Sequence, residues 1–332
     1  MAASSLVATQ RDDLVIAAVQ FEHRDGDRDF NLARIEALTA AASAAGATVV
    51  SFHECSISAY TFAQTLTPAE LLKLAEEVPD GHSVQRLIEI AKKYNVHLLA
   101  GLFERQGEKV YNAYVCVNGD GLVAKHRKLH PFVNPYLSPG DEFVSFDIEG
   151  WKCSILICYD NNLPENVRIV ALQGAEVLFM PHVTGCLPSV MPGRGIVAPE
   201  LWANRQHDPV PLRLEFEGPK GRGWLMRWLP ARAWENGLYV VFTNPIGLDG
   251  GQVRNGNAMV LDPFGEVLSE CHRLDDDFCL GRLTYEKLLQ SSGRRYLRAR
   301  RPELYGELTR PSTEPPLTAP GWTLQRPPDA VT

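Results

Sequence analysis

The chain has 332 residues, of which 45% are hydrophobic and 22% charged, as in a globular protein with a large core. Its formal net charge of −7 disfavours nucleic acid as the main partner, because phosphate binding requires a basic surface. The sequence contains no apolar run near the roughly 20 residues that span a bilayer, and residues 1–13 lack the pattern of a signal peptide. We therefore expect a cytoplasmic protein without a membrane or nucleic-acid partner.

The seven cysteines are odd in number and form no CxxC pair. This spacing disfavours a disulfide framework and a tetrahedral zinc site, and reduced thiols fit the cytoplasm. The open question is which of the thiols is reactive.

Apolar strand-like runs alternate with amphipathic helical stretches along the chain. In chain order the pattern predicts a strand at 14–21, a helix at 31–45, a strand at 48–52, a helix at 83–94, a strand at 97–103, a hairpin at 110–117 and 122–128, a strand at 153–157, a helix at 164–172, a strand at 176–180, a helix at 229–236, a strand at 239–243, a hairpin at 257–261 and 266–270, and a strand at 278–283. About eleven or twelve strands and six helices indicate two sheets with helices outside, an α/β domain over residues 1–310.

Two segments lack this alternation of strand-like and helical patterns. Residues 186–222 contain six prolines and no hydrophobic period, and so long a loop inside a compact domain is usually functional. Residues 311–332 are rich in proline and threonine and are predicted to be a tail.

Three polar residues stand at the ends of predicted strands. Cys158 lies at a strand–turn–helix junction, where free backbone N–H groups stabilise a thiolate or an oxyanion, although a buried core cysteine is the simpler interpretation. Lys128 ends a hairpin strand, where a basic residue often only blocks strand pairing. Glu54 follows a strand at its carboxyl end, the edge at which open α/β folds place functional groups.

Taken together, these residues and their neighbours resemble the carbon–nitrogen hydrolases of the nitrilase superfamily, which include amidases, N-carbamoyl hydrolases and nitrilases. The resemblance implies a four-layer α-β-β-α sandwich of the nitrilase type. It also implies that the chain assembles as a homodimer or a higher homo-oligomer, with a C-terminal tail that crosses the dimer. The matching segments, which extend along nearly the whole chain, are FHE at 52–54, YNA at 111–113, HRKLH at 126–130, SPGDE at 138–142, ICYD at 157–160, PE at 164–165, ARAWENG at 231–237 and RPELY at 301–305.

The resemblance also implies a role for each residue of a Glu-Lys-Cys triad. Glu54 acts as general base and acid, and Cys158 forms a thioester acyl-enzyme. Lys128 and the backbone N–H of Tyr159 stabilise the oxyanion of the tetrahedral intermediate. This chemistry requires no metal and no organic cofactor.

The chain departs from the family at one position. Many members carry a second glutamate shortly after the lysine, but residues 131–140 contain no acid, and Val133 or Asn134 stands at the approximate place. We hypothesise that Asn134, His130 or a carboxylate of the long insertion replaces it, with Glu215 and Glu217 as the candidates.

The Cys-Tyr-Asp sequence at 158–160, followed by Pro-Glu, is typical of the amide- and carbamoyl-cleaving branches rather than the nitrile-cleaving branch. We therefore expect hydrolysis of a non-peptide C–N bond in a small primary amide or N-carbamoyl compound, with release of ammonia. Weaker candidates for substrate binding are Tyr60, Asn134, Tyr136, His182 and Thr184, although His182 also fits a core histidine.

The insertion at 186–222 has two equally weighted interpretations. It is either a lid that sets substrate size and offers an arginine to a substrate carboxylate, or an oligomer contact. Its candidate side chains are Trp202, Arg194, Arg205 and Arg213.

Three alternative functions stay open. The first is a nitrilase acting on nitriles, and the second is a catalytically silent relative that binds a ligand or protein. The third is a redox-sensing thiol, which Cys153 does not support as a resolving cysteine, because five strand positions place it about 16 Å from Cys158.

Overall fold

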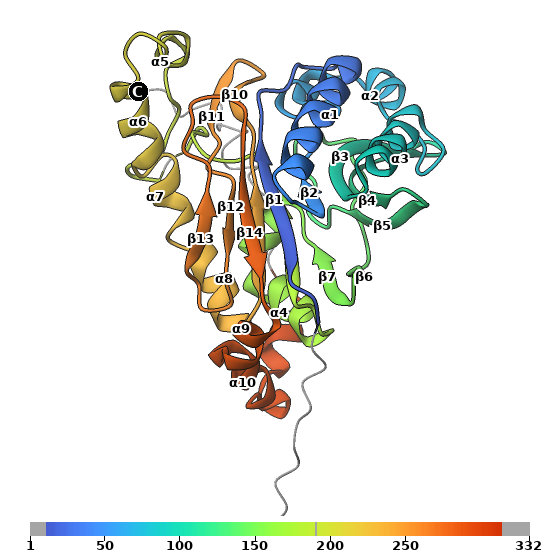
Figure 1. Ribbon diagram of the computed structural model, residues 1–332, viewed down its shortest axis with the longest axis vertical. Helices are drawn as coiled ribbons and strands as arrows, with labels where there is room; N and C mark the ends of the chain where they lie inside the picture. The colour runs from blue at the N-terminus through green and yellow to red at the C-terminus, as the bar shows by residue number, and fades with distance from the viewer. Residues whose placement is uncertain (1–10, 190, 314–332) are drawn as a thin grey trace, which may run out of the picture.

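The computed structural model describes residues 11–189 and 191–313, which form two six-stranded sheets packed face to face (Figure 1). The first sheet has the order β14-β1-β2-β3-β4-β5 and the second β13-β12-β9-β8-β7-β6. In the first sheet β1, β2 and β3 run parallel, as do β7, β8 and β9 in the second, and the outer strands add antiparallel pairs. The strands of the first sheet are β1 (Leu14–Gln20), β2 (Val49–Ser51), β3 (His97–Gln106), β4 (Lys109–Asn118), β5 (Gly121–Arg127) and β14 (Asp277–Leu283). Those of the second are β6 (Ser145–Ile148), β7 (Trp151–Ile155), β8 (Val177–Pro181), β9 (Tyr239–Thr243), β12 (Met259–Leu261) and β13 (Val267–Glu270).

The layers follow from the alternation of side chains along each strand. In β1, Leu14 and Ile16 point into the core between the two sheets, while Ala17 and Val19 pack toward the outer helices of the first sheet. Those helices are α1 (Arg28–Ala44) and α3 (His82–Tyr94), and the outer face of the second sheet packs against α4 (Pro164–Leu172) and α8 (Leu229–Asn236). The predicted four-layer α-β-β-α sandwich is therefore confirmed.

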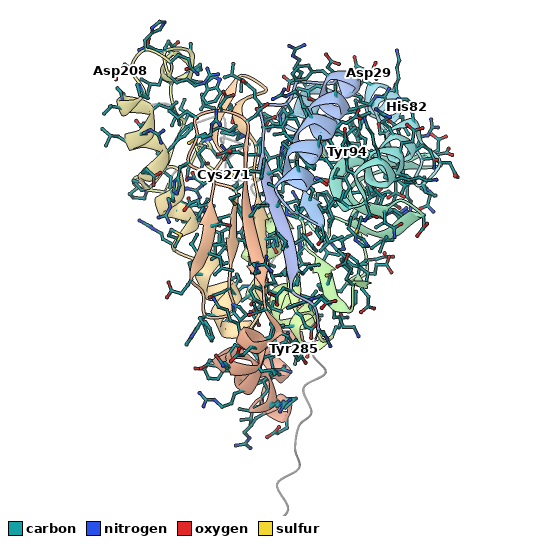
Figure 2. The ribbon with its side chains drawn as sticks, in the orientation of Figure 1. Asp29, His82, Tyr94, Asp208, Cys271 and Tyr285 are labelled. Carbon is teal, nitrogen blue, oxygen red and sulfur yellow. The ribbon has the colours of Figure 1, made fainter. Side chains whose placement is uncertain are left out.

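The side chains of the central core extend the length of the sheets. Cys271 and Tyr285, both labelled in Figure 2, belong to this core or pack against it. Asp208, in the long insertion, lies at the opposite end of the molecule from Tyr285 (Figure 2).

The insertion at 186–222 is more ordered than its sequence predicts. It contains α5 (Pro199–Ala203), α6 (Val210–Glu217) and the start of α7 (Arg222–Leu225). These helices close a small core around Trp202 and Phe216 against the hairpin of β10 (Ile246–Asp249) and β11 (Gln252–Asn255). α5 has five residues with one of them buried, and α6 has eight with two buried, so neither shows a clear hydrophobic period, which explains why the pattern missed them.

The remaining short elements lie at the edges of the sandwich. They are η1 (Thr61–Thr65), α2 (Pro68–Leu74), η2 (Cys158–Asn162), α9 (Tyr285–Gln290), α10 (Ser292–Arg298), η3 (Pro302–Leu304) and η4 (Gly306–Thr309). Most of the predicted C-terminal tail, residues 314–332, lies outside the described residues, and the division at residue 310 stays a prediction. Among the described residues, the helices are all too short or too polar to span a membrane.

Candidate active site

The three predicted catalytic residues meet at the ends of strands from both sheets. Glu54 follows β2, Lys128 directly follows β5, and Cys158 follows β7. The Lys128 Nζ donates a hydrogen bond of 2.6 Å to Glu54 Oε1. Glu54 and Lys128 are at most 1% exposed and Cys158 is 6% exposed, so the charged pair is buried and the thiol lies at its edge.

Both oxygens of Glu54 are held in place. Oε1 also accepts a hydrogen bond of 2.6 Å from Asn112 Nδ2, and Oε2 accepts one of 3.1 Å from the backbone N–H of Val183. Asn112 belongs to a matching sequence segment that received no role, and the Val183 N–H has no sequence signal because any residue except proline supplies it. A carboxylate with fixed lone pairs is well suited to receive a proton from one direction.

Cys158 occupies a strained backbone position. Its φ of 51° lies in the left-handed region, which non-glycine residues rarely adopt, at the first residue of η2. The first hydrogen bond of this 3₁₀ helix runs from the Asp160 N–H to the Ile157 carbonyl, so the Tyr159 N–H precedes the helical ladder. This turn places a thiol beside a backbone donor, the combination expected from the sequence.

The charges around the thiol keep it protonated in the resting site. Burial and then the negative charge of Glu54 raise the pKa of Cys158 to about 12, while Lys128 opposes the shift. At neutral pH the group is therefore a thiol, and attack on a carbonyl requires a base to take its proton.

Lys128 stays charged in spite of its burial. Burial alone would lower its pKa, but Cys158 in its ionised form and the carboxylate of Glu54 both raise it, and the pKa lies well above the usual value. The Nζ also lies 4.6 Å from the ring centroid of Phe132 and 5.3 Å from that of Tyr60. Cation–π attraction from these rings holds the ammonium without a further acid.

Asp160 connects the strand end of Lys128 with the turn of Cys158. Its buried carboxylate accepts hydrogen bonds from the backbone N–H groups of Leu129, His130 and Ile157, at 3.1, 3.0 and 3.3 Å, and from His130 Nδ1 at 2.9 Å. Although burial raises its pKa, His126, whose Nε2 lies 3.7 Å from Oδ2, and the hydrogen-bonded His130 lower it below the usual value. Asp160 was part of a matching segment, but its positioning role was not predicted.

A cavity of about 530 Å³ opens onto the thiol. Cys158, Tyr159 and the predicted substrate-binding residues Tyr60 and Thr184 line it. The Tyr60 hydroxyl and the Trp228 Nε1, both in this lining, are buried and have no hydrogen-bond partner among the described residues. Unsatisfied buried polar groups in a cavity are well placed to bind a polar ligand.

Three predicted substrate-binding residues do not line this cavity. Asn134 donates from Nδ2 to the carbonyls of Ala63 and Leu66 at 2.8 and 2.9 Å, which fixes η1. Tyr136 is 57% exposed. His182 packs beside Trp228 under the cavity wall, and burial followed by the charge of Lys128 lowers its pKa to about 3, which matches the core-histidine interpretation.

The candidates for the missing second glutamate lie elsewhere. His130 is bonded to Asp160, Glu215 pairs with Lys220 at 2.8 Å, and Glu217 lies 3.8 Å from Arg222. These contacts place the three side chains outside the cavity lining, which among the described residues contains no aspartate or glutamate. In the insertion, Arg205 and Arg213 bond the backbone carbonyls of Leu274 and His272, whereas Arg194 lines the cavity.

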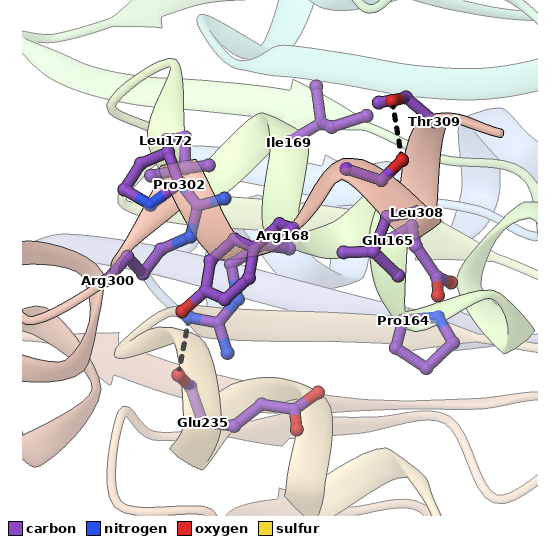
Figure 3. A pocket seen from close by; sticks show the side chains of 12 residues that line it. Pro164, Glu165, Arg168, Ile169, Leu172, Glu235, Arg300, Pro302, Leu308 and Thr309 are labelled. Atoms are coloured by element: carbon purple, nitrogen blue, oxygen red, sulfur yellow. Dashed lines mark hydrogen bonds between the residues drawn. The ribbon is translucent and has the colours of Figure 1, made fainter.

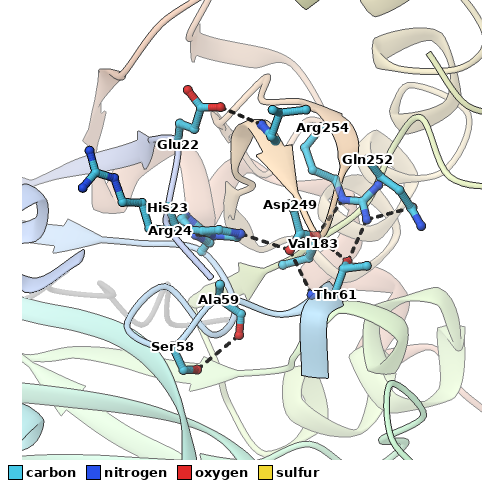
Figure 4. A network of polar contacts seen from close by, with 12 residues as sticks. Glu22, His23, Arg24, Ser58, Ala59, Thr61, Val183, Asp249, Gln252 and Arg254 are labelled. Atoms are coloured by element: carbon cyan, nitrogen blue, oxygen red, sulfur yellow. Dashed lines mark hydrogen bonds and ion pairs between the residues drawn. The ribbon is translucent and has the colours of Figure 1, made fainter. Parts of the chain in front are cut away.

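A buried polar cluster lies behind the cavity wall (Figure 4). His23 lies 2.8 Å from His53, the neighbour of Glu54, and 3.0 Å from Asp249, which also pairs with Arg254 at 3.0 Å. Asp249 further accepts hydrogen bonds from the backbone and hydroxyl of Thr61, a cavity-lining residue. The cluster therefore ties the strand end of Glu54 to the cavity wall.

Donor atoms of His23, Asp25 and Asp249 lie within 4.8 Å of one another, close enough to suggest a metal site. Arg254 already neutralises Asp249, however, and His23 is committed to hydrogen bonds on both ring nitrogens. A divalent cation would meet the repulsion of a buried guanidinium, so the residues present fit an ion pair better than a metal.

A second cavity, of about 510 Å³, lies apart from the triad (Figure 3). It is lined by α4, α8 and the C-terminal segment, and Arg168 in its wall donates to the Glu235 carbonyl at 3.0 Å. Its exposed apolar side chains include Leu172 and Leu308. Among the described residues that line it, Glu54, Lys128 and Cys158 do not occur.

Comparison with known proteins identifies the family. The sequence model of the carbon-nitrogen hydrolases matches residues 15–288. The chain belongs to the carbon–nitrogen hydrolase family. This carbon–nitrogen hydrolase is 33% identical over 301 residues to an (R)-stereoselective amidase from Pseudomonas sp., covering 89% of this chain and 94% of that protein. It is 29% identical over 265 residues to a nitrilase from Pyrococcus abyssi, covering 79% and 86%.

The fold of this hydrolase also matches solved structures. An amidase from Nesterenkonia sp. AN1 aligns with a TM-score of 0.65 at 22% identity, over 89% of this chain and 96% of that one. That structure shows covalent addition of the acetamide moiety of fluoroacetamide at its active-site cysteine. The likeness shows that this chain has the same fold as that amidase.

Proposed function

We propose that this carbon–nitrogen hydrolase cleaves a small primary amide or N-carbamoyl compound through a thioester on Cys158. The observation that carries the proposal is the buried Glu54–Lys128 pair of 2.6 Å beside a thiol that opens onto a cavity. A base, a fixed cation and a nucleophile are the groups that amide hydrolysis through a thioester requires.

The first half of the reaction forms the acyl-enzyme. Glu54 takes the proton of the Cys158 thiol as Sγ attacks the carbonyl carbon, and the oxygen becomes an oxyanion facing Lys128 Nζ and the Tyr159 N–H. The proton on Glu54 then passes to the leaving nitrogen. The C–N bond breaks, ammonia departs, and the acyl group remains on sulfur as a thioester.

The second half releases the acid. Glu54 removes a proton from water, whose oxygen attacks the thioester carbon, and the oxyanion again faces Lys128 and the Tyr159 N–H. The C–S bond then breaks and the proton returns to sulfur. With an N-carbamoyl substrate the released carbamate decomposes to an amine and carbon dioxide. The scheme uses no metal or organic cofactor, while the cytoplasmic location and the homodimer implied by the resemblance stay predictions.

Ammonia release from paired amides, N-carbamoyl compounds and nitriles tests the proposal. We expect the wild-type protein to act on amides or carbamoyl compounds and Cys158→Ala to be inactive. Cys279→Ala is the matched control, because Cys279 is a buried thiol of β14 outside the cavity lining, and we expect it to retain activity.

The other outcomes separate the alternatives. Hydrolysis of nitriles alone would assign the protein to the nitrilase branch. Equal activity of Cys158→Ala and wild type would remove Cys158 as the nucleophile. A protein inactive on all three classes, with Cys158 also inert toward a thiol-alkylating reagent, would be a silent relative.

A further inference from the structure

The charges that line the catalytic cavity are of one sign. Arg194, Arg227 and Arg232 are part of its lining, which among the described residues contains no acidic side chain, and the Lys128–Glu54 ion pair lies next to Cys158 outside that lining. The protein as a whole carries a net charge of −7, so this positive lining is a local feature. A cavity with one sign of charge attracts and orients ligands of the other sign.

Two of these cations are already engaged in hydrogen bonds with other residues of the protein. Lys128 is bonded to Glu54. Arg232 donates to the carbonyls of Asn161 and Asn162 at 3.0 and 2.9 Å and to Glu235 at 3.3 Å, so it fixes the turn that carries Cys158. Neither group is available as the main anchor of a substrate anion.

Arg194 is placed differently. Its guanidinium lies 3.8 Å from the ring centroid of Trp224, and its Nε is buried without a hydrogen-bond partner among the described residues. None of the described acidic residues forms an ion pair with Arg194. Burial, and the like charge of Arg227, lower its pKa. Stacking on an aromatic face fixes the plane of a guanidinium and leaves its edge free for a planar, bidentate anion.

Arg227 completes the arrangement. Its side chain is exposed at the cavity, and the described part of the chain offers it no acidic partner. Two neighbouring guanidinium groups without a counter-charge repel each other, and an anion placed between them removes the repulsion. A carboxylate fits the fork geometry of arginine, and a cavity of about 530 Å³ has room for a small molecule that carries one.

We propose that Arg194 and Arg227 form a carboxylate-binding subsite, so that the substrate is a small amide or carbamoyl compound with a carboxylate at the end away from the scissile bond. The inference rests on the proposed function and names the substrate class of the same site. The insertion at 186–222 then acts as a specificity element, because it brings Arg194 to the cavity.

Monoamides of dicarboxylic acids of increasing length, compared with their neutral methyl esters and with ω-amino amides of equal length, test the proposal. For wild type we expect kcat/KM to be highest for the carboxylates, lower for the esters and lowest for the amines. For Arg194→Gln we expect at least about a tenfold loss with the carboxylates, mainly in KM, and little change with the esters. Arg213→Gln is the control in the same insertion, because Arg213 bonds the His272 carbonyl outside the cavity.

Reversing the charge at Arg194 distinguishes a loss of carboxylate recognition from a loss of folding. Arg194→Glu is expected to reverse the order and favour ω-amino amides over carboxylates, a gain that an unfolded variant does not produce. Wild-type kcat/KM values that are equal for acids and esters, or an Arg194→Gln loss that is equal for both, would overturn the subsite while leaving the proposed function intact. A wild-type protein that hydrolyses neither these amides nor the corresponding N-carbamoyl acids would overturn both.

Discussion

Replacing Asp160 with asparagine tests how the two sheets are held in register at the active site. Asp160 Oδ2 accepts the N–H groups of Leu129 and Ile157, the neighbours of Lys128 and Cys158, and Oδ1 accepts both donors of His130. Asparagine has nearly the same shape but offers one acceptor oxygen and an NH₂ group. Two of the four donors would therefore face a donor instead of an acceptor.

The expected loss of stability follows from those two contacts. A buried donor left unsatisfied costs about 1–3 kcal/mol, so Asp160→Asn should lower the free energy of unfolding by at least about 2 kcal/mol. Because the change acts next to Lys128 and Cys158, the proposed catalytic residues, kcat should also fall by about 10²-fold, the order of magnitude for a misplaced catalytic group. Urea denaturation followed by tryptophan fluorescence and ammonia release measure the two effects. Asp147→Asn, at an exposed position of β6, is the matched control.

The pH dependence of the unfolding free energy is a second, independent test of the role of Asp160. The folded pKa of Asp160 lies below the unfolded value of about 3.9, so its contribution to stability is present above about pH 4 and is lost as the pH falls below it. Asp160→Asn removes a titrating group, and its stability should fall less steeply in acid than that of wild type. Unfolding free energies within about 0.5 kcal/mol of each other, or identical acid slopes, would refute the reasoning.

Three further predictions concern the surroundings of the thiol. Glu54→Gln removes a charge that raises the pKa of Cys158, so iodoacetamide should label Cys158 faster at pH 8–10 while ammonia release is lost. The labelling is followed by intact-protein mass spectrometry, and slower labelling would contradict the electrostatic account. Asp249→Asn leaves the buried Arg254 without its counter-charge and should cost about 3–5 kcal/mol in urea denaturation, whereas the exposed Asp25→Asn should cost less than about 1 kcal/mol. Asn134→Ala frees η1, which follows Tyr60 and begins with Thr61, so KM for amides should rise more than kcat falls, and an unchanged KM would count against a role in shaping the cavity.

Much of the fold was predictable because its main elements are long or strongly patterned. The helix expected at 229–236 coincides with α8, and the hairpin expected at 110–117 and 122–128 is β4 and β5. Weakly patterned elements escaped prediction. The strands β10 and β11 have four residues each and pair only with each other, and their burial depends on the insertion helices that pack over them. Such tertiary support leaves no periodic signal in the local sequence.

The candidate site also has parts that the sequence indicates and parts that it does not. Glu54, Lys128 and Cys158 could be proposed from the sequence because each follows a recognisable strand and stands in a matching segment, and their catalytic roles stay predictions. The contacts that orient them were not visible, because the Val183 N–H is a backbone group and Asp160 acts across the two sheets, about 30 residues from the N–H groups of Leu129 and His130. The cavity walls were the least predictable part, since Tyr136 and His182 have suitable chemistry but point elsewhere.

Where many family members carry a second glutamate, this chain surrounds Lys128 with apolar and aromatic side chains. Val133, at that approximate place, is 3% exposed and packs in an apolar cluster with Tyr60 and Leu137. Phe132 and Tyr60 present their rings to the ammonium at 4.6 and 5.3 Å. Ring faces attract a cation without carrying a net charge, whereas a second carboxylate here would raise the pKa of the Cys158 thiol further, as Glu54 already does. An aromatic surrounding therefore holds Lys128 in place and leaves Glu54 as the carboxylate beside the thiol, which fits its proposed role as the base.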